Sequence, residues 1–303
     1  MKQALLGNLT PSGRLVFAIA LTFSCFIIVF FTALLLAMPI YHVNLAGTLE
    51  ILNQTDNPKA LALLEYFQVT QSFGLFIIPP ILIGYFFERN SWAFLLADRP
   101  GSGTLYIIVF ILMFVSLPLI NWLVDVNEMM KLPAFLKVVE DWMKSAEDQA
   151  GKLTDTFLAG KSFTNFLFNI FMIGILPAVG EEFMFRGLLQ KLLKDWLKNI
   201  HIAIFITAFL FGALHLQFYG LLPRMILGVI FGYLFYWSGS IWVPVFAHFV
   251  NNSGAIIISY LANLSLISQK YQDFGSTHSF ILIFLSLLMT LTCLFTAYRK
   301  KPL

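Results

Sequence analysis

Long apolar stretches dominate this sequence and decide what it can fold into. A membrane-spanning helix needs about 20 predominantly apolar residues, and about eight stretches meet that requirement: roughly 15–40, 67–87, 104–124, 163–187, 200–218, 221–237, 241–264 and 279–298. Only 12% of the residues are charged and 59% are hydrophobic, whereas a soluble domain has about 25% charged residues. The sequence therefore predicts an all-α fold, a polytopic integral membrane bundle of about eight transmembrane helices in a lipid bilayer.

The basic residues predict the orientation of the bundle, because cytoplasmic loops carry an excess of Lys and Arg. With the N-terminus inside, the inner side receives Lys2, Arg14, Arg89, Arg99, Arg186, Lys191, Lys194, Lys198, Arg299, Lys300 and Lys301. The short outer connections receive Lys59, Arg224 and Lys270. The first apolar stretch is too long for a signal-peptide core and is read as a retained span. We expect a multi-pass protein of the cell membrane, a bacterial inner membrane, with both termini cytoplasmic.

The segment from about residue 125 to 161 is the sizeable part expected outside the membrane. Apolar residues recur there at steps of three and four, at Phe135, Val139, Trp142, Ala146, Ala150, Leu153 and Phe157. This spacing predicts an amphipathic helix over about 133–158, lying on the membrane or capping the bundle, with a substrate-gating lid as the alternative. The chain then divides into N-terminal helices (1–124), this segment (125–161), a core (162–265), and a C-terminal loop with the last helix and a basic tail (266–303).

Composition also narrows the classes of partner and cofactor. The net charge is +3, from 19 basic and 16 acidic residues, and no dense Lys/Arg patch is present, so no nucleic-acid partner is expected. Cys25 and Cys293 lie in apolar runs without a CxxC or Cys/His cluster. Neither a disulfide framework nor a cysteine-based metal site is expected.

Ionisable residues interrupt the fourth apolar stretch in "PAVGEEFMFRGLLQ", residues 177–190. Each costs about 2.5–3.5 kcal/mol in a bilayer, which makes such residues functional-site candidates. Glu182 and Arg186 are four residues apart and share a helix face, while Glu181 points about 100° away. We therefore expect Arg186 to neutralise Glu182 and Glu181 to face another partner.

Two further spans carry polar groups that need partners inside a bundle. In "FLFGALHL", Phe211 lies one turn before His215. In "VPVFAHFVNN", Asn252 lies one turn after His248. Proline residues stand four positions before Glu181 and before His248, where each removes a helix hydrogen bond and frees a carbonyl one turn back. These features predict a shared, water-accessible interior site.

The glycines of the sixth span predict packing rather than chemistry. Gly228 and Gly232 form a GxxxG pair, the spacing that lets two membrane helices approach closely. We expect a neighbouring helix to lie against them.

Peptide hydrolysis can be catalysed by the residue types found here, which are a glutamate, two histidines and an asparagine. The glutamate can activate water as a general base, and histidine and asparagine can donate to a developing oxyanion. The sequence has no HExxH motif, no aspartate pair in its spans and no recognisable serine nucleophile. The same Glu and His residues could instead form the proton path of a transporter. The lack of an internal repeat counts modestly against transport.

The stretches "EEFMFR", "FGALH" and "HFVNN" resemble the EExxxR, FxxxH and HxxxN motifs of the CAAX-protease and bacteriocin-processing family, which includes type II CAAX prenyl endopeptidases. The resemblance covers about a third of the chain and makes residues 162–265 the catalytic core. It implies an intramembrane endopeptidase acting on a membrane-associated or lipidated protein or peptide. A non-catalytic scaffold or immunity protein of the same family is the alternative.

The resemblance also implies roles for particular residues. Glu181 would be the general base, helped by His215, and His248 and Asn252 would stabilise the oxyanion. Glu182 and Arg186, with Phe211, would support the site. No cofactor is required in this interpretation, and zinc held by Glu181, His215 and His248 is the alternative. The sequence leaves the oligomeric state open.

One expectation conflicts with a shared site. Counted along straight helices, Glu181 and His248 lie toward the inner side, whereas His215 lies near the outer end of its span. A kink at Pro177 or a shifted start of the fifth span must bring them level.

Overall fold

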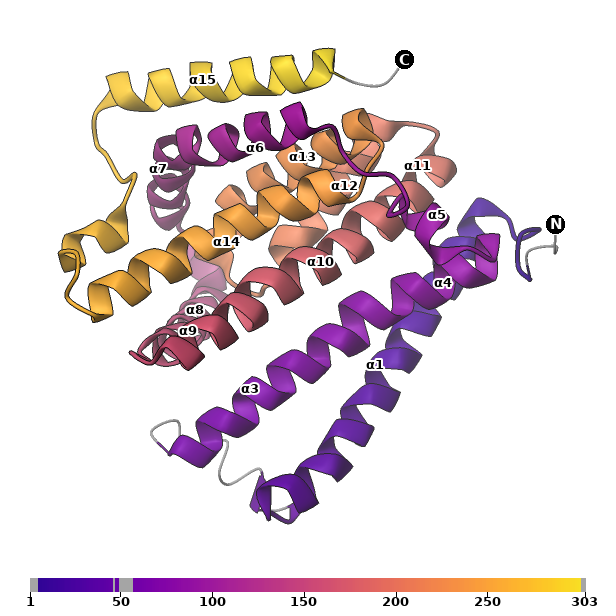
Figure 1. Cartoon of the computed structure of the whole chain (residues 1–303), viewed down its shortest axis with the longest axis horizontal. Coiled ribbons are helices and arrows are strands. Elements are labelled where there is room, and N and C mark those ends of the chain that lie inside the picture. Colours follow the sequence, from indigo (N-terminus) through magenta and orange to yellow (C-terminus); the bar gives the residue numbers. More distant parts are fainter. Residues whose placement is uncertain (1–4, 46, 49–56, 301–303) are drawn as a thin grey trace.

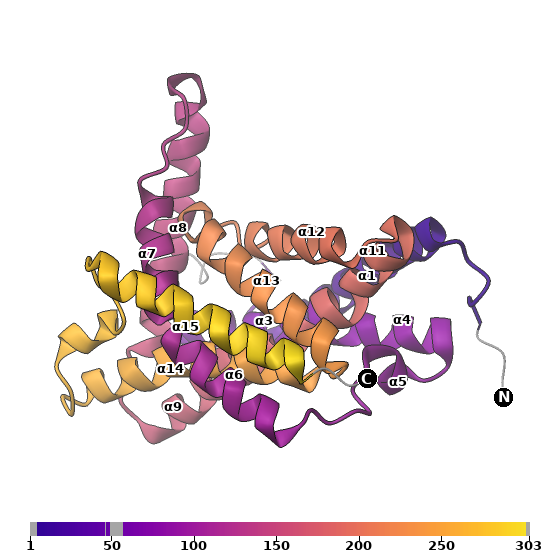
Figure 2. The ribbon, with the colours of Figure 1, turned by 90° about the horizontal axis from the view of Figure 1, so that it is seen from above.

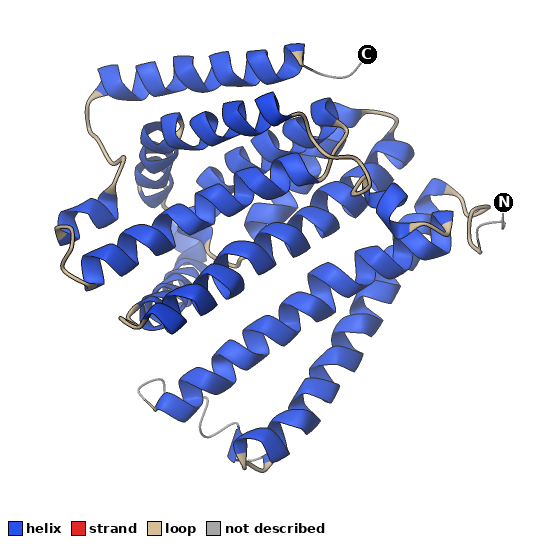
Figure 3. Cartoon of the chain, viewed as in Figure 1, coloured by secondary structure: helices blue, strands red, loops and turns tan. Residues whose placement is uncertain are grey.

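Helices account for every regular element in the part of the chain that the computed structural model describes, residues 5–45, 47–48 and 57–300 (Figures 1 and 3). The α-helices are α1 (Pro11–Tyr41), α3 (Pro58–Ser72), α4 (Ile78–Glu88), α5 (Ser91–Leu95), α6 (Gly103–Val115), α7 (Leu117–Glu128), α8 (Lys137–Leu158), α9 (Phe163–Asn169), α10 (Leu176–Glu182), α11 (Lys191–Leu197), α12 (Ile200–Ala213), α13 (Leu221–Ser238), α14 (Trp242–Asn263) and α15 (Phe280–Arg299). π-Helical segments join α3 to α4 (Phe73–Ile77), α9 to α10 (Ile170–Ile175) and α10 to α11 (Phe183–Gln190). The predicted all-α fold class is confirmed.

Several of these helices are long and apolar enough to cross a membrane. Among the described residues six qualify: Pro11–Tyr41, Pro58–Glu88, Phe163–Leu197, Phe218–Ser238, Trp242–Asn263 and Phe280–Arg299. The pair α6 and α7, bent by 45°, would be a seventh, and α12 is a shorter apolar helix. The chain is therefore a multi-pass membrane protein, and each of the eight predicted stretches is helical. Lys2 and Lys301 lie outside the described residues, and the cytoplasmic placement of the termini stays a prediction.

The helices surround a central pair (Figure 1). The helix from α9 to α11 runs through the middle of the molecule beside α14. On one side α1 packs against the continuous helix formed by α3 and α4, and these two helices diverge toward one end. On the other side α6 lies between the central pair and α15. The central pair carries most of the candidate site residues.

The helix of the fourth stretch is longer than predicted, since it reaches Leu197 rather than residue 187. The basic segment expected to form an inner loop continues the helix as α11, which ends where Lys198 takes a left-handed conformation (φ 55°). Asn199 caps α12 directly afterwards, because its side chain accepts from the backbone N–H groups of His201 and Ile202. Glu181 therefore lies near the middle of a long helix and not at its inner end.

The shortness of α12 resolves the conflict over depth. This helix has only 14 residues and ends at Ala213 rather than residue 218, so His215 lies in the following turn and not in the span. At 1.5 Å per residue, Glu181 lies about 24 Å back from Leu197, and Ala213, two residues before His215, lies about 20 Å along from Ile200. The α12 helix packs back along α11, which brings His215 level with Glu181.

The entry of α14 sets the depth of His248. Ile241, just before α14, packs beside the middle of the central helix, where a Cβ added to Gly187 would lie 3.7 Å from Ile241 Cδ1. The backbone N–H of Ile241 donates to Leu96 O at 3.3 Å. Because α14 starts part-way down the central helix, His248 lies near Glu181 although it is only in the second turn of α14.

The bend between α6 and α7 turns α7 out of the bundle. Pro118 opens α7, and the buried Ser286 hydroxyl of α15 joins the two helices, because it accepts from Leu119 N at 3.2 Å and donates to Val115 O at 2.6 Å. Figure 2 shows α7 and α8 projecting away from the other helices. The amphipathic helix predicted over 133–158 corresponds to a 3₁₀ turn (Ala134–Leu136) followed by α8.

The predicted close packing at Gly228 and Gly232 occurs against α12. A Cβ on Gly228 would lie 3.0 Å from Ala208 Cα, and one on Gly232 would lie 2.9 Å from Ile204 Cγ2. Both backbone carbonyls also accept hydrogen bonds from side chains of the central helix, as described below. These glycines therefore set the distance between α12, α13 and the polar site.

Gly228→Ala is expected to lower the free energy of unfolding by about 1–3 kcal/mol, because the added methyl group meets backbone that cannot move aside without separating α12 from α13. Denaturant titration of the detergent-solubilised protein measures the loss. Gly254→Ala is the matched control, because a Cβ there meets nothing within 4 Å, so it should be neutral or stabilising by up to about 1 kcal/mol. Equal stability of the two variants would contradict the packing argument.

Candidate active site

A row of polar side chains follows one face of the central helix toward α13. Arg186 Nη1 donates to Glu182 Oε1 at 2.7 Å, and Arg186 Nη2 donates to Gly228 O at 3.1 Å. One turn later, Gln190 Nε2 donates to Gly232 O at 3.1 Å. The side chains of Glu182 and Arg186 are 0% and 1% exposed. The row is thus a buried, charge-paired support that joins the central helix to α13.

Aromatic rings enclose the Arg186 guanidinium. Its Cζ lies 4.7 Å from the centroid of Phe211 and 5.4 Å from that of Phe231. Cation–π contacts of this kind partly replace the hydration that a buried cation loses. Phe211, named from the sequence as a supporting residue, therefore touches the ion pair directly.

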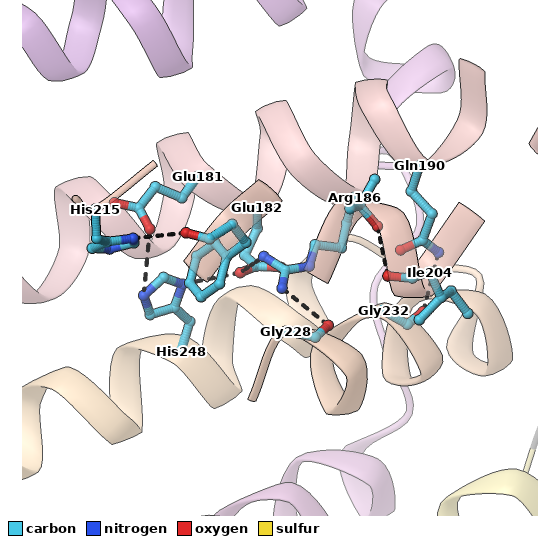
Figure 4. A network of polar contacts seen from close by, with 11 residues as sticks. Glu181, Glu182, Arg186, Gln190, Ile204, His215, Gly228, Gly232 and His248 are labelled. Carbon is cyan, nitrogen blue, oxygen red and sulfur yellow. Dashed lines mark hydrogen bonds and ion pairs between the residues drawn. The ribbon is translucent and has the colours of Figure 1, made fainter. Parts of the chain in front are cut away.

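His248 connects this support to Glu181 (Figure 4). Its Nδ1 lies 2.9 Å from Glu182 Oε1, and its Nε2 lies 3.9 Å from Glu181 Oε2. The carboxylate of Glu182 is an acceptor, so Nδ1 carries a proton and Nε2 faces Glu181. The ring also stacks on Phe231, with 5.3 Å between centroids and 25° between planes. These contacts fix the orientation of the imidazole.

His215 approaches Glu181 from the turn after α12 (Figure 4). Its Nδ1 lies 2.7 Å from Phe211 O, and because a carbonyl only accepts, Nδ1 is the donor. In the neutral ring Nε2 is then an acceptor. The next residue, Leu216, has a left-handed backbone (φ 54°), which forms the tight turn at this point. The turn thus presents His215 at the end of α12.

Asn252 supports the irregular backbone ahead of Glu181. Its Nδ2 donates to Ile173 O at 3.0 Å. That carbonyl lies one turn before Pro177, which has no N–H to offer it, and the helix is locally π-helical over Ile170–Ile175. The carbonyl freed by the proline is therefore bound by a side chain of the site.

The four expected catalytic residues line one cavity of about 410 Å³, together with Asn251. Helix α8 contributes Ala150, Leu153, Thr154 and Phe157 to its wall, α3 contributes Gln68, and α13 contributes Arg224. Glu181 Oε2 is buried and has no hydrogen-bond donor. A water molecule occupies about 30 Å³ of liquid, so the cavity has room for water and for part of a peptide beside this oxygen.

The polar residues of this cavity occur in a segment with known relatives. Residues 163–254 match the family model described as type II CAAX prenyl endopeptidase Rce1-like. The Rce1-like segment contains Glu181, His215, His248 and Asn252, so the resemblance found from the motifs is confirmed over this part of the chain. No solved structure matches the chain.

A curated protein aligns with a similar fraction of the sequence. The chain is 28% identical over 116 residues to "Uncharacterized protein YpbD" of Bacillus subtilis (strain 168). The alignment covers 37% of this chain and 54% of that protein, so it spans about half the length of the relative. The description of that relative names no activity.

The Rce1-like segment does not converge as a metal site. Among the described residues, no group of three or more His, Cys, Asp or Glu side chains is arranged to hold a metal ion. His215 and His248 each donate Nδ1–H to a protein acceptor, which leaves Nε2 as the nitrogen of each ring that could bind a metal, and Glu181 Oε2 lies 3.9 Å from His248 Nε2. Zinc held by Glu181, His215 and His248 stays a prediction from the sequence, and no step of the proposed reaction runs through a metal.

Sequence reasoning missed two residues beside the site. Gln190 continues the four-residue spacing of Glu182 and Arg186, and that periodicity could have identified it. Arg224 was assigned to an outer connection, but it lines the cavity. No local pattern could have placed it there, because its position depends on the turn between α12 and α13.

Asn252→Ala is expected to cost about 1 kcal/mol of unfolding free energy through the lost hydrogen bond to Ile173 O. In a Pro177→Ala background the cost should be smaller, because residue 177 then offers that carbonyl an N–H. A double-mutant cycle measures the coupling. Asn263→Ala is the control, since Asn263 Nδ2 makes a similar bond to Leu158 O at 2.8 Å elsewhere on α14. The prediction is wrong if the unfolding free-energy changes of Asn252→Ala and Pro177→Ala add as fully as those of Asn263→Ala and Pro177→Ala.

Proposed function

We propose that the chain is an intramembrane endopeptidase that hydrolyses a peptide bond with water activated by Glu181. At the level of the family, the Rce1-like match supports an intramembrane endopeptidase of the CAAX type. The observation that carries the residue assignment is the position of Glu181 Oε2. This oxygen is buried, lacks a donor, and faces His248 Nε2 across 3.9 Å in a cavity that also holds His215.

The contacts of the two ring nitrogens support a protonated His248 in this proposal. Nδ1 lies 2.9 Å from Glu182 Oε1 and Nε2 lies 3.9 Å from Glu181 Oε2, so each nitrogen faces a carboxylate. Hydrogen bonds from an imidazolium to a carboxylate are charge-assisted and therefore strong. The imidazolium then has Nδ1 held by Glu182 and a second donor, Nε2–H, directed into the cavity.

The hydrolytic step follows from these donors and acceptors. Glu181 takes a proton from water as the water oxygen bonds to the carbonyl carbon, with His215 Nε2 as a second acceptor that orients the water. His248 Nε2–H and the uncommitted N–H of Asn252 Nδ2 donate to the oxyanion. The C–N bond then breaks, and the proton on Glu181 passes to the leaving amine. The products are a new amine and a new carboxylic acid, which keeps the second proton of the water until it ionises in solution.

The proposed substrate is a membrane-associated or lipidated protein or peptide. Transmembrane helices and α8 both line the cavity, so a chain lying at the membrane can reach Glu181 from within the bundle. CAAX-type processing and leader-peptide processing both fit this description. The proposed reaction requires no metal. We also propose that the protein lies in the cell membrane with both termini on the cytoplasmic side.

Purified full-length chain in liposomes should cleave at least one member of a peptide set that contains prenylated CAAX peptides and leader-type peptides. With the reaction run in H₂¹⁸O, mass spectrometry should find one ¹⁸O in the newly formed carboxyl group. Proton flux across the same liposomes is recorded in parallel. Flux dependent on Glu181 without cleavage of any peptide would reject hydrolysis in favour of transport.

A further inference from the structure

Arg224 lies where two cavities meet. It belongs to the first turn of α13 and lines the cavity of about 410 Å³ that contains Glu181 and His215. It also lines an outer cavity of about 870 Å³ between α7, α8 and the segment from Tyr219 to Arg224. A ligand that extends from the outer cavity toward Glu181 therefore passes this guanidinium.

The Arg224 guanidinium is held by neutral groups only. Nη1 donates to Gln217 O at 3.3 Å, and Nη2 donates to the side-chain oxygen Oε1 of the same residue. Among the described residues Arg224 forms no ion pair, in contrast to Arg186. The contacts with Gln217 orient the planar group, and the carboxylates that interact electrostatically with it, Glu147 and Glu181, do not form a direct ion pair with it.

The local backbone is shaped around this side chain. A Cβ added to Gly220 would lie 2.7 Å from Arg224 Cζ and closer still to Nη1, so the glycine gives the guanidinium its space. The segment is fixed by Asn127 of α7, whose Nδ2 donates to Phe218 O at 3.0 Å and whose Oδ1 accepts from Leu222 N at 2.7 Å. Asn127 is 1% exposed. Arg224 is thus a positioned cation and not a mobile surface side chain.

We propose that Arg224 is a binding subsite for a carboxylate of the peptide substrate. Arginine presents a rigid fork of N–H donors that matches a carboxylate, and charge-assisted bonds of this type are the strong ones. The first turn of a helix adds a partial positive charge of the same sign. Since the subsite and Glu181 share one cavity, the bound carboxylate selects which peptide bond is presented to the activated water.

Two sources offer the same carboxylate chemistry. A free C-terminus would make the chain release a short C-terminal fragment, whereas an Asp or Glu side chain would select an internal acidic residue. The inference rests on the proposed peptidase function, but binding tests it independently of cleavage. The binding measurement uses the Glu181→Gln chain, which keeps the shape of the site.

The experiment compares three versions of each peptide: one with a free C-terminal acid, one with a C-terminal amide, and one amide with an internal Glu replaced by Gln. We expect Glu181→Gln protein in detergent to bind the carboxylate-bearing version about 10- to 100-fold more tightly than its neutral partner. Adding Arg224→Gln should bring the tighter binding down to the level of the neutral peptide and leave neutral-peptide binding unchanged. Lys270→Gln, which removes the same charge outside both cavities, should change neither.

Three results would overturn the proposal. One is equal binding of acid and neutral peptides, or binding of neither, by the Glu181→Gln chain. Another is a loss of acid and neutral binding by the same factor in Arg224→Gln, which would indicate that Arg224 only holds Gln217 and the turn that carries His215. The third is an acid preference that survives Arg224→Gln. If acid-selective binding is found without cleavage by the unmodified chain, the subsite stands and the peptidase function fails.

Discussion

Replacing Glu181 with glutamine is expected to lower kcat/KM for every cleaved peptide by about 10²- to 10⁴-fold, the usual contribution of a general base. The amide keeps the size of the side chain but cannot take a proton from water. The substitution should not unfold the protein, because the carboxylate oxygen Glu181 Oε2 accepts no hydrogen bond from the described residues in the folded state. The measurement is the initial rate of peptide cleavage in liposomes, with unfolding followed on the same preparation.

The matched control is Glu65→Gln. Glu65 is also a glutamate in a candidate membrane span, Pro58–Glu88, but it lies outside the cavity of Glu181. It undergoes the same chemical change and should retain cleavage within about twofold of the unmodified chain. Equal losses in the two variants would trace the effect to charge in the membrane and remove Glu181 from its proposed role.

A chelator tests the mechanism of the same step separately. Because the proposed proton transfers use only side chains, a strong chelator is expected to leave the cleavage rate unchanged. Loss of cleavage on chelation, with recovery on adding zinc, would move the water-activating role from Glu181 alone to a metal. That result would assign the metal to the Nε2 atoms of His215 and His248, since each Nδ1 is bonded to a protein acceptor.

Local sequence patterns predicted the elements of this protein well, because the cost of placing polar groups in lipid is a local property of each segment. The apolar stretches predicted where helices lie, and the spacing of Glu182 and Arg186 predicted a shared helix face. The GxxxG pair predicted a close helix contact. Each of these predictions depends on residues within one or two turns of the same helix. The GxxxG pair in addition needs a neighbouring helix, but it does not specify which one.

Depth in the bundle could not be predicted from the same patterns. Whether His215 reaches Glu181 depends on two helix ends, Leu197 and Ala213. The first lies beyond the apolar stretch because the lysine-bearing α11 continues the helix. The second falls before His215, where the chain turns through Leu216. Arg224 reaches the cavity for the same reason, and its position is set by Asn127, which is distant in sequence.

Arg186→Met is expected to lower the free energy of unfolding by about 3–5 kcal/mol, because it leaves the carboxylate of Glu182 buried without its cation. Glu182 is 0% exposed, so water cannot replace the guanidinium. Denaturant titration in detergent measures the loss. A smaller loss, about that of a surface substitution, would show that Glu182 is neutral in the folded protein.

The double variant Glu182→Gln with Arg186→Met separates stability from activity. Removing both charges together leaves no uncompensated ion, so most of the lost stability should return. Cleavage should not return with it, because the neutral amide introduced in place of Glu182 can orient the Nδ1–H of His248 but cannot balance an imidazolium there. A double variant that regains both stability and cleavage would show that the ion pair only holds helices together. Recovery of stability alone would show that the charge on Glu182 also acts through His248 on the reacting carbonyl.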